Sequence, residues 1–379
     1  MTAARYGARL DALRALLRDA GGAVLLAGPG AELRYLAGYD ARALERVTML
    51  VVPADADAVL VVPRLEREPA VASTAARAGL VTVRTWEETD DPYAVVAGAV
   101  PSAARTGGTL YVGDRLWALF VLGLTKAFPG ARLALASEIL ESLRMRKDAD
   151  EVELLRAAAH AADRVIAAVA HGRLVGRSEA DVAREVVERL IDEGHDSAEH
   201  GQIVASGPNS ASPHHAASDR VIGPGEPVVL DIGGSLGGYA SDTTRTVWVA
   251  GDDAIAPDRE FVTIHETVRR AYEAAVATVR PGAACQSVDA AARDVITRAG
   301  YGPRYVHRTG HGIGLEVHEE PYIVGGNERP LEPGNAFSIE PGIYLEGRYG
   351  VRLEDIVVCT SDGADVLDEA ARELAVVSG

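Results

Sequence analysis

The first third of the chain alternates short apolar runs with amphipathic segments. Runs of about four to eight apolar residues bounded by turn residues are typical of strands, and the spacing between them suits helices. The short polar link "ADADA" joins the second and third runs and predicts a hairpin. This alternation predicts an α/β layer domain. The apolar runs occupy residues 22–28, 46–53, 58–63, 80–86, 109–114 and 132–136.

A long amphipathic segment begins near residue 143 and predicts a helix, because its apolar side chains fall on one stripe. The charged stretch "RKDADE" supplies an Asp N-cap before that helix. We therefore place a domain boundary there, with an N-terminal domain over residues 1–147 and a second domain over residues 148–379. The stripe consists of Leu154, Leu155, Ala158, Ala162, Ile166 and Val169.

The second domain mixes helical and strand patterns. Ser178 has the side chain of an N-cap, and further amphipathic stretches at 256–279 and 287–300 end at Gly or Pro-Gly. Four strand-like runs lie between and after these helices, and their order suggests antiparallel pairing. The pattern predicts an α+β fold. The runs are "EPVVLDIGG", "GYASDTTRTVWVA", "NAFSIEPGIYL" and "GVRLEDIVVCT".

The composition of the chain excludes several classes of binding partner. The formal net charge of −17 argues against a nucleic-acid or anionic-membrane partner, since either would repel most of the surface. Cys285 and Cys359 are the only cysteines, which excludes a disulfide framework and fits two buried thiols in a reducing compartment. The run at 22–28 is too short for a membrane span or signal. We expect a cytoplasmic protein.

Carboxylates interrupt several apolar runs. Asp231 lies near the end of one predicted strand and Asp242 in the next, across a Gly-rich turn that would form a hairpin. Glu340 and Glu354 repeat the pattern in later strands. Each alone fits a turn cap, a surface ion pair or an edge-strand charge. Together, buried carboxylates favour a cation, because they are costly unless paired.

The stretch "HRTGHGIGLEVHEEP", residues 307–321, is rich in His and Gly. His307 and His311 have the spacing of a zinc helix, but the intervening glycines weaken a helix, so we expect extended chain that approaches other backbone closely. With His311, the four carboxylates form an oxygen-rich cluster with one imidazole. Such a cluster suits two divalent cations, Mn²⁺ or Co²⁺ better than a structural Zn²⁺.

In this order, "SGPNSASPHH", "LDIGGSLGGYASDTTRT", "HRTGHGIGLEVHEEP", "SIEPGIY" and "VRLED" resemble the pita-bread metallopeptidases, which include Xaa-Pro dipeptidases (prolidases) and Xaa-Pro aminopeptidases. The resemblance implies a pita-bread α+β catalytic domain behind a smaller creatinase-like α/β domain. It also implies a homodimer that acts on proline-containing dipeptides or short peptides.

Residue by residue, the resemblance implies a site of two divalent ions, Mn²⁺ before Co²⁺ or Zn²⁺, with a bridging water as nucleophile. Glu340 would carry the proton from that water to the leaving nitrogen. His214 and His318 would contact substrate and support the tetrahedral intermediate, and His307 would line the site. Arg352 would order the cluster. The metal ligands would be Asp231, Asp242, His311, Glu340 and Glu354.

Other candidates have weaker support. His215 is interpreted as a surface or packing histidine, and Tyr239 and Tyr344 as core before ligand support. Many prolidases have Arg directly after the Pro of the "HExP" stretch, where it can hold the dipeptide carboxylate, whereas this chain has Tyr322.

A dipeptidase of this kind therefore needs another cation. Arg42 and Arg46 are the candidates, although each also fits a solvated surface arginine.

Substrate length is left open. We favour a dipeptidase, because the N-terminal domain is compact and single, and keep an Xaa-Pro aminopeptidase as the alternative. A metal-free creatinase-type C–N hydrolase or a non-catalytic peptide-binding scaffold would usually lack ligands, whereas all five are present here.

Overall fold

The computed structural model describes residues 1–198 and 201–378, which form two compact units. The first unit spans Met1–Arg144 and the second Met145–Gly379. The predicted division at 147/148 falls slightly later and stays a prediction. None of the helices in the described residues combines the length and apolar character that a membrane span requires.

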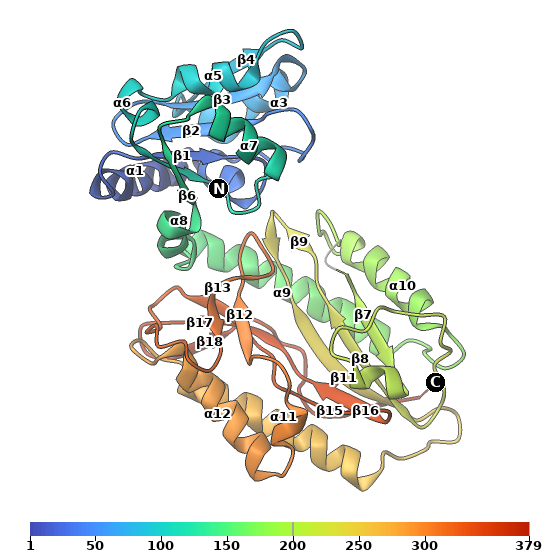
Figure 1. The fold of residues 1–379 in the computed structure, drawn as a ribbon. Coiled ribbons are helices and arrows are strands. Elements are labelled where there is room, and N and C mark those ends of the chain that lie inside the picture. The colour runs from blue at the N-terminus through green and yellow to red at the C-terminus, as the bar shows by residue number, and fades with distance from the viewer. Residues whose placement is uncertain (199–200, 379) are drawn as a thin grey trace. The chain divides into compact units, whose positions relative to one another are not determined.

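The first unit is a mixed sheet covered by helices, in the strand order β4-β3-β2-β1-β5-β6 (Figure 1). All the predicted strands of this unit are present, and β2 and β3 form the predicted antiparallel hairpin. The strands are β1 Val24–Ala27, β2 Met49–Pro53, β3 Ala58–Pro63, β4 Val81–Trp86, β5 Thr109–Val112 and β6 Arg132–Leu135. The helices are α1 Ala3–Asp19, α2 Ala31–Ala37, η1 Arg64–Glu66, α3 Arg67–Ala72, α4 Thr74–Arg77, α5 Pro92–Ala99, α6 Ser102–Arg105, α7 Ala118–Ala127 and α8 Ser137–Arg144.

The second unit begins with α9, which Asp148 caps through a reciprocal capping box with Glu151. Ser178 caps α10 in the same way, as predicted. Helix α12 starts at Cys285, two residues before the predicted start at 287. The helices are α9 Ala149–Ala170, α10 Glu179–Asp192, η2 Gly207–Ala211, α11 Arg259–Thr278, α12 Cys285–Arg298 and η3 Gly302–Arg304.

Strands of the second unit pair mostly antiparallel, in the orders β19-β11-β8-β7 and β13-β12-β14-β17-β18, with hairpins β9-β10 and β15-β16. Figure 1 shows α9 and α10 on one side of these strands and α11 and α12 on the other. The apolar cores follow this division, because α10 packs on β7, β8 and β11, and α11 and α12 pack on β14 to β17. The strands are β7 Ile203–Ser206, β8 Glu226–Ile232, β9 Ser235–Leu236, β10 Tyr239–Ala240, β11 Thr243–Val249, β12 Gly310–Gly312, β13 Glu319–Ile323, β14 Ala336–Ile339, β15 Gly342–Leu345, β16 Tyr349–Arg352, β17 Asp355–Cys359, β18 Ala364–Val366 and β19 Ala375–Val377.

Three predicted strands are each broken in two, which corrects the sequence interpretation. The breaks fall at Asp242, between β10 and β11, at Glu340, between β14 and β15, and at Glu354, between β16 and β17. Pro341 explains one of them, since proline has no N–H to donate to a ladder. These carboxylates therefore stand at strand ends rather than inside strands.

Candidate active site

The predicted site residues converge on one cavity of about 780 Å³ in the second unit. Six different chain segments contribute its acidic and imidazole groups. The predicted residues that line the cavity are Asp231, Asp242, His214, His307, His311, His318, Glu340, Arg352 and Glu354.

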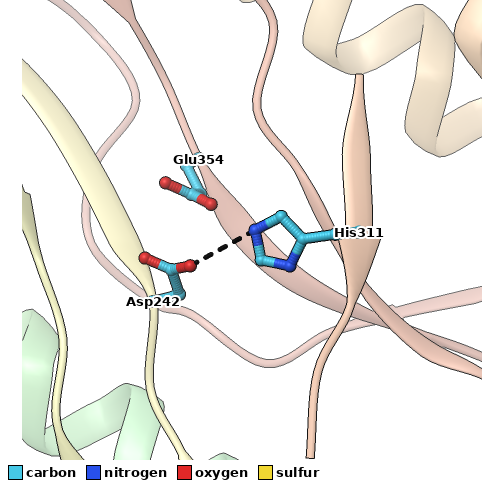
Figure 2. A group of neighbouring side chains, drawn as sticks. All are labelled: Asp242, His311 and Glu354. Atoms are coloured by element: carbon cyan, nitrogen blue, oxygen red, sulfur yellow. Dashed lines mark ion pairs between the residues drawn. The ribbon is translucent and has the colours of Figure 1, made fainter. Parts of the chain in front are cut away.

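Asp242, His311 and Glu354 form the centre of this site. One potential ligand atom from each lies within 4.8 Å of the others. Figure 2 shows the two carboxylates and the imidazole pointing toward one another. The Nε2 atom of His311 is 3.5 Å from Asp242 Oδ2 and 3.3 Å from Glu340 Oε1. Glu340 thus adjoins the same group.

The backbone fixes which nitrogen of His311 faces the carboxylates. Its Nδ1 is 3.1 Å from the carbonyl of Gly312, so Nδ1 carries the proton and donates. Nε2 then presents its lone pair to Asp242 and Glu340. Burial, followed by the charge of the neighbouring His318, lowers the pKa of His311 to about 3, so the ring is neutral. A neutral lone pair facing carboxylates is the arrangement of a metal ligand.

The carboxylates cannot all ionise without a counter-ion. Burial, then the charge of Asp231, raises the pKa of Asp242 well above its ordinary value. Burial and then Asp242 do the same to the pKa of Glu354, and burial raises the pKa of Glu340 to about 7. Divalent cations would remove this repulsion, and oxygen donors with one imidazole suit first-row divalent ions. The residues present therefore fit a metal centre.

A chain of hydrogen bonds connects Asp231 to His307 through Arg352 and Tyr344. The guanidinium of Arg352 donates to Asp231 Oδ2 and, over 2.7 Å, to the hydroxyl of Tyr344. That hydroxyl lies 2.9 Å from Nε2 of His307. Because Nδ1 of His307 donates to the carbonyl of Arg308 at 2.7 Å, Nε2 accepts from Tyr344.

Tyr344 is buried, as the favoured core interpretation predicts, but its hydroxyl also contacts Arg352 and His307, so the support role that was ranked second applies as well. The sequence favoured the core interpretation, since a Tyr in an apolar strand is usually packing.

His214 and His215 both line the cavity on the segment that follows η2. His215 was interpreted as a surface or packing residue, but it lies 2.8 Å from Glu179 Oε2. Glu179 is fully buried and also accepts hydrogen bonds from backbone and side chains of Ser206 and Ser218. Sequence reasoning missed Glu179, because a Glu directly after a Ser cap is common at helix starts.

The segment 307–321 is extended around β12 and β13, as predicted. A Cβ on Gly310 would clash with the carbonyl of Ser338, and one on Gly312 with backbone of β13. Both glycines thus allow the close approach that the sequence suggested. His318 packs edge-on against His311, with ring centroids 4.2 Å apart.

Other candidates lie elsewhere. Tyr239 is buried and donates to Glu151 in the cap of α9, which agrees with a core position. Arg46 pairs with Glu45 and Glu88 on the first unit. Arg42 is exposed on that unit. Their predicted role in substrate binding stays a prediction.

Two family matches cover most of the chain. Residues 153–361 match "Metallopeptidase family M24", and residues 9–146 match "Creatinase/Prolidase N-terminal domain". These matches agree with the resemblance seen in the motifs.

Relatives and solved structures extend over nearly the whole chain. The "Probable dipeptidase PepE" of Mycobacterium tuberculosis is 46% identical over 98% of this chain and 96% of its own length. The "Xaa-Pro dipeptidase" of Lactobacillus helveticus is 34% identical over 97% of this chain and 98% of its own. The crystal structure of dipeptidase PepE from Mycobacterium ulcerans has a TM-score of 0.92 at 46% identity, with both chains fully covered. The predicted architecture, a pita-bread catalytic domain behind a creatinase-like domain, is confirmed.

Proposed function

This chain belongs to metallopeptidase family M24 and is a hydrolase, and we propose that it is a dinuclear-metal peptidase that cleaves Xaa-Pro dipeptides. The observation that carries this proposal is the group of Asp242, His311 and Glu354, whose ligand atoms lie within 4.8 Å of one another. Relatives named as dipeptidases align over nearly the whole chain, which supports the choice of substrate length.

In this proposal two divalent ions are held by Asp231, Asp242, His311, Glu340 and Glu354. Bound there, such ions supply charge neutralisation, Lewis acidity toward the scissile carbonyl and a lowered pKa of the attacking water. Mn²⁺ is the preferred ion, with Co²⁺ and Zn²⁺ as alternatives.

The protein's own groups would perform the proton transfers and the positioning. Glu340 accepts the proton of the attacking water and returns it to the leaving proline nitrogen, from a site where the Ser338 hydroxyl, 3.3 Å away, orients its carboxylate. Arg352 holds Asp231 and Tyr344 in place. His214 and His318, on two separate segments that line the cavity, contact the substrate and stabilise negative charge on the carbonyl oxygen.

The proposed preference for proline follows from the chemistry of the Xaa-Pro bond. An Xaa-Pro bond has no N–H and its proline fixes φ, so peptidases that pair with that N–H handle it poorly. The ring of His307 lines the cavity, backed by the buried ring of Tyr344 with centroids 5.4 Å apart, and offers a surface against which a pyrrolidine ring can pack. An Xaa-Pro aminopeptidase remains the alternative, because Tyr322 replaces the arginine that many prolidases carry.

A direct test uses metal-depleted protein reloaded with Mn²⁺ or Co²⁺ and assayed on Ala-Pro and Ala-Pro-Ala. We expect hydrolysis only after reloading, with Ala-Pro preferred. Glu340→Gln should lower kcat by at least about 100-fold, since it removes the proton carrier. The matched control is Glu346→Gln, at an exposed turn, which should leave kcat unchanged.

Two results would oppose the proposal. Full activity in the chelated protein would favour a metal-free creatinase-type reaction. Unchanged hydrolysis by Glu340→Gln would remove the assigned proton transfer.

A further inference from the structure

Arg308 is a cation of the cavity wall without an acidic partner in the described residues. The described lining residues include two arginines, Arg308 and Arg352. Arg352 is only 2% exposed, and its guanidinium is occupied by Asp231 and Tyr344. Within residues 1–198 and 201–378, the side chain of Arg308 forms no ion pair or hydrogen bond, and only its carbonyl accepts one. An arginine that faces an acid-rich cavity in this state is available to a ligand.

The side chain of Arg308 is held against Tyr322. Its guanidinium carbon lies 4.3 Å from the centre of the Tyr322 ring. This cation–π contact holds the guanidinium over the ring without using its N–H groups in a hydrogen bond within the described residues, so they can bind a carboxylate in bidentate fashion. Tyr322 is the residue that occupies the position of the prolidase arginine, so the charge that Tyr322 lacks is supplied by the side chain packed on it.

The backbone around Arg308 is fixed as well. Its carbonyl accepts the 2.7 Å hydrogen bond from His307, and the next residue, Thr309, donates its N–H to Asp289 at 3.2 Å. Arg293, paired with Asp289, donates to the carbonyl of His307 at 3.0 Å. Arg308 is therefore presented from a rigid segment, which lowers the entropy cost of binding an anion.

Arg308 lines the same cavity as His311 and Glu340. A short substrate bound at those groups therefore has its end in the cavity that the guanidinium of Arg308 faces.

We propose that Arg308, supported by the ring of Tyr322, binds the C-terminal carboxylate of the dipeptide and so sets the substrate length of this enzyme. The inference rests on the proposed Xaa-Pro hydrolysis and deepens it. A longer peptide places a neutral amide where the dipeptide places its carboxylate, and the guanidinium then loses its charged partner. This assignment replaces Arg42 and Arg46 as the source of the required cation.

The test compares three substrates, Ala-Pro, Ala-Pro-amide and Ala-Pro-Ala, with the Mn²⁺-loaded protein. The wild type should prefer Ala-Pro over the amide by at least about tenfold in kcat/KM. Arg308→Met should lower kcat/KM for Ala-Pro by about 10- to 100-fold, mainly through KM, and change the amide by less than about threefold. Arg304→Met, at a nearby exposed arginine, is the matched control and should behave as wild type.

A relocated charge makes the test independent of folding defects. The double variant Arg308→Met/Tyr322→Arg places an arginine at the neighbouring position, and we expect it to recover a preference for Ala-Pro over the amide. A purely structural role for Arg308 would not be rescued in this way.

The outcomes separate the two proposals. Wild-type protein that cleaves none of the three substrates refutes Xaa-Pro hydrolysis, and this inference with it. Wild-type protein that cleaves Ala-Pro, with Arg308→Met losing equal activity on all three substrates or on none, refutes the role of Arg308 alone. A wild-type preference for Ala-Pro-Ala also overturns that role and favours the aminopeptidase.

Discussion

The buried carboxylate of Glu179 forms hydrogen bonds with the segment that carries His214 and His215 into the cavity lining. It accepts 2.7 Å hydrogen bonds from the N–H and the hydroxyl of Ser206, and bonds of 3.1 and 2.6 Å from the same two groups of Ser218. Glu179→Gln keeps the shape of the side chain and removes its charge. The amide nitrogen of the introduced glutamine would then face N–H and O–H donors, so some of the hydrogen bonds from Ser206 and Ser218 must be lost.

The expected loss in free energy of unfolding follows from the pKa of Glu179. Burial alone would raise this pKa, but the hydrogen bonds from Ser218, Ser206 and His215 outweigh burial and lower it to about 2, from an ordinary value of 4.5. At 1.36 kcal/mol per pKa unit, the ionised form stabilises the fold by about 3 kcal/mol. Glu179→Gln, which mimics the protonated acid, should lower the free energy of unfolding at pH 7 by about the same amount.

The pH dependence has a definite sign. A carboxyl whose folded pKa is depressed stabilises the fold fully above its unfolded pKa, and the contribution disappears as the pH falls toward the folded pKa. The difference in stability between wild type and Glu179→Gln should therefore be constant above about pH 5 and shrink between about pH 4.5 and pH 2.

The assay must report on the second unit alone, since a chain with two units need not unfold in a single two-state transition. Hydrogen–deuterium exchange of peptides covering β7 and β8 at increasing urea meets this need. Glu188→Gln, at an exposed position of α10, is the matched control and should change stability by less than about 0.5 kcal/mol. If Glu179→Gln is as stable as this control at pH 7, or if its deficit persists unchanged at pH 3, the reasoning is wrong.

Three further predictions concern the cluster and its surroundings. Glu354→Gln should bind less Mn²⁺ by elemental analysis and lose at least about 100-fold in kcat/KM, and retention of the full metal content would contradict its assignment as a ligand. Tyr344→Phe removes the hydroxyl between Arg352 and His307 and should lower kcat by about tenfold and the unfolding free energy by about 1 to 3 kcal/mol, so a loss of stability with unchanged kcat would argue for a core role alone. Lys147→Met leaves its partner Glu319 buried without its cation and should cost about 3 to 5 kcal/mol in unfolding free energy. The exposed neighbour Arg146→Met should cost less than about 1 kcal/mol, and equal effects for the two variants would count against a special cost of the buried pair.

The sequence determined the elements and indicated the candidate metal ligands. Apolar periodicity and capping residues report burial along a single segment, so the strands of the first unit and the starts of α9 and α10 followed from them. The candidate ligand residues were identified because a carboxylate in an apolar run is costly without a cation, and this cost is visible locally.

Sequence reasoning placed Asp242, Glu340 and Glu354 within strands, whereas the structure places them at strand ends. Periodicity shows which face of a segment is apolar, but a two-residue break between strands leaves almost no trace in it.

Only the tertiary structure decided which polar groups surround the ligands. Tyr344 meets His307 across 37 positions, and Glu179 meets Ser218 across 39. Such partners are chosen by the packing of distant strands, which no local pattern encodes. The proposed cation for the substrate carboxylate was found in the same way. The sequence showed that Tyr322 had replaced an arginine, and only the fold placed the guanidinium of Arg308 on its ring.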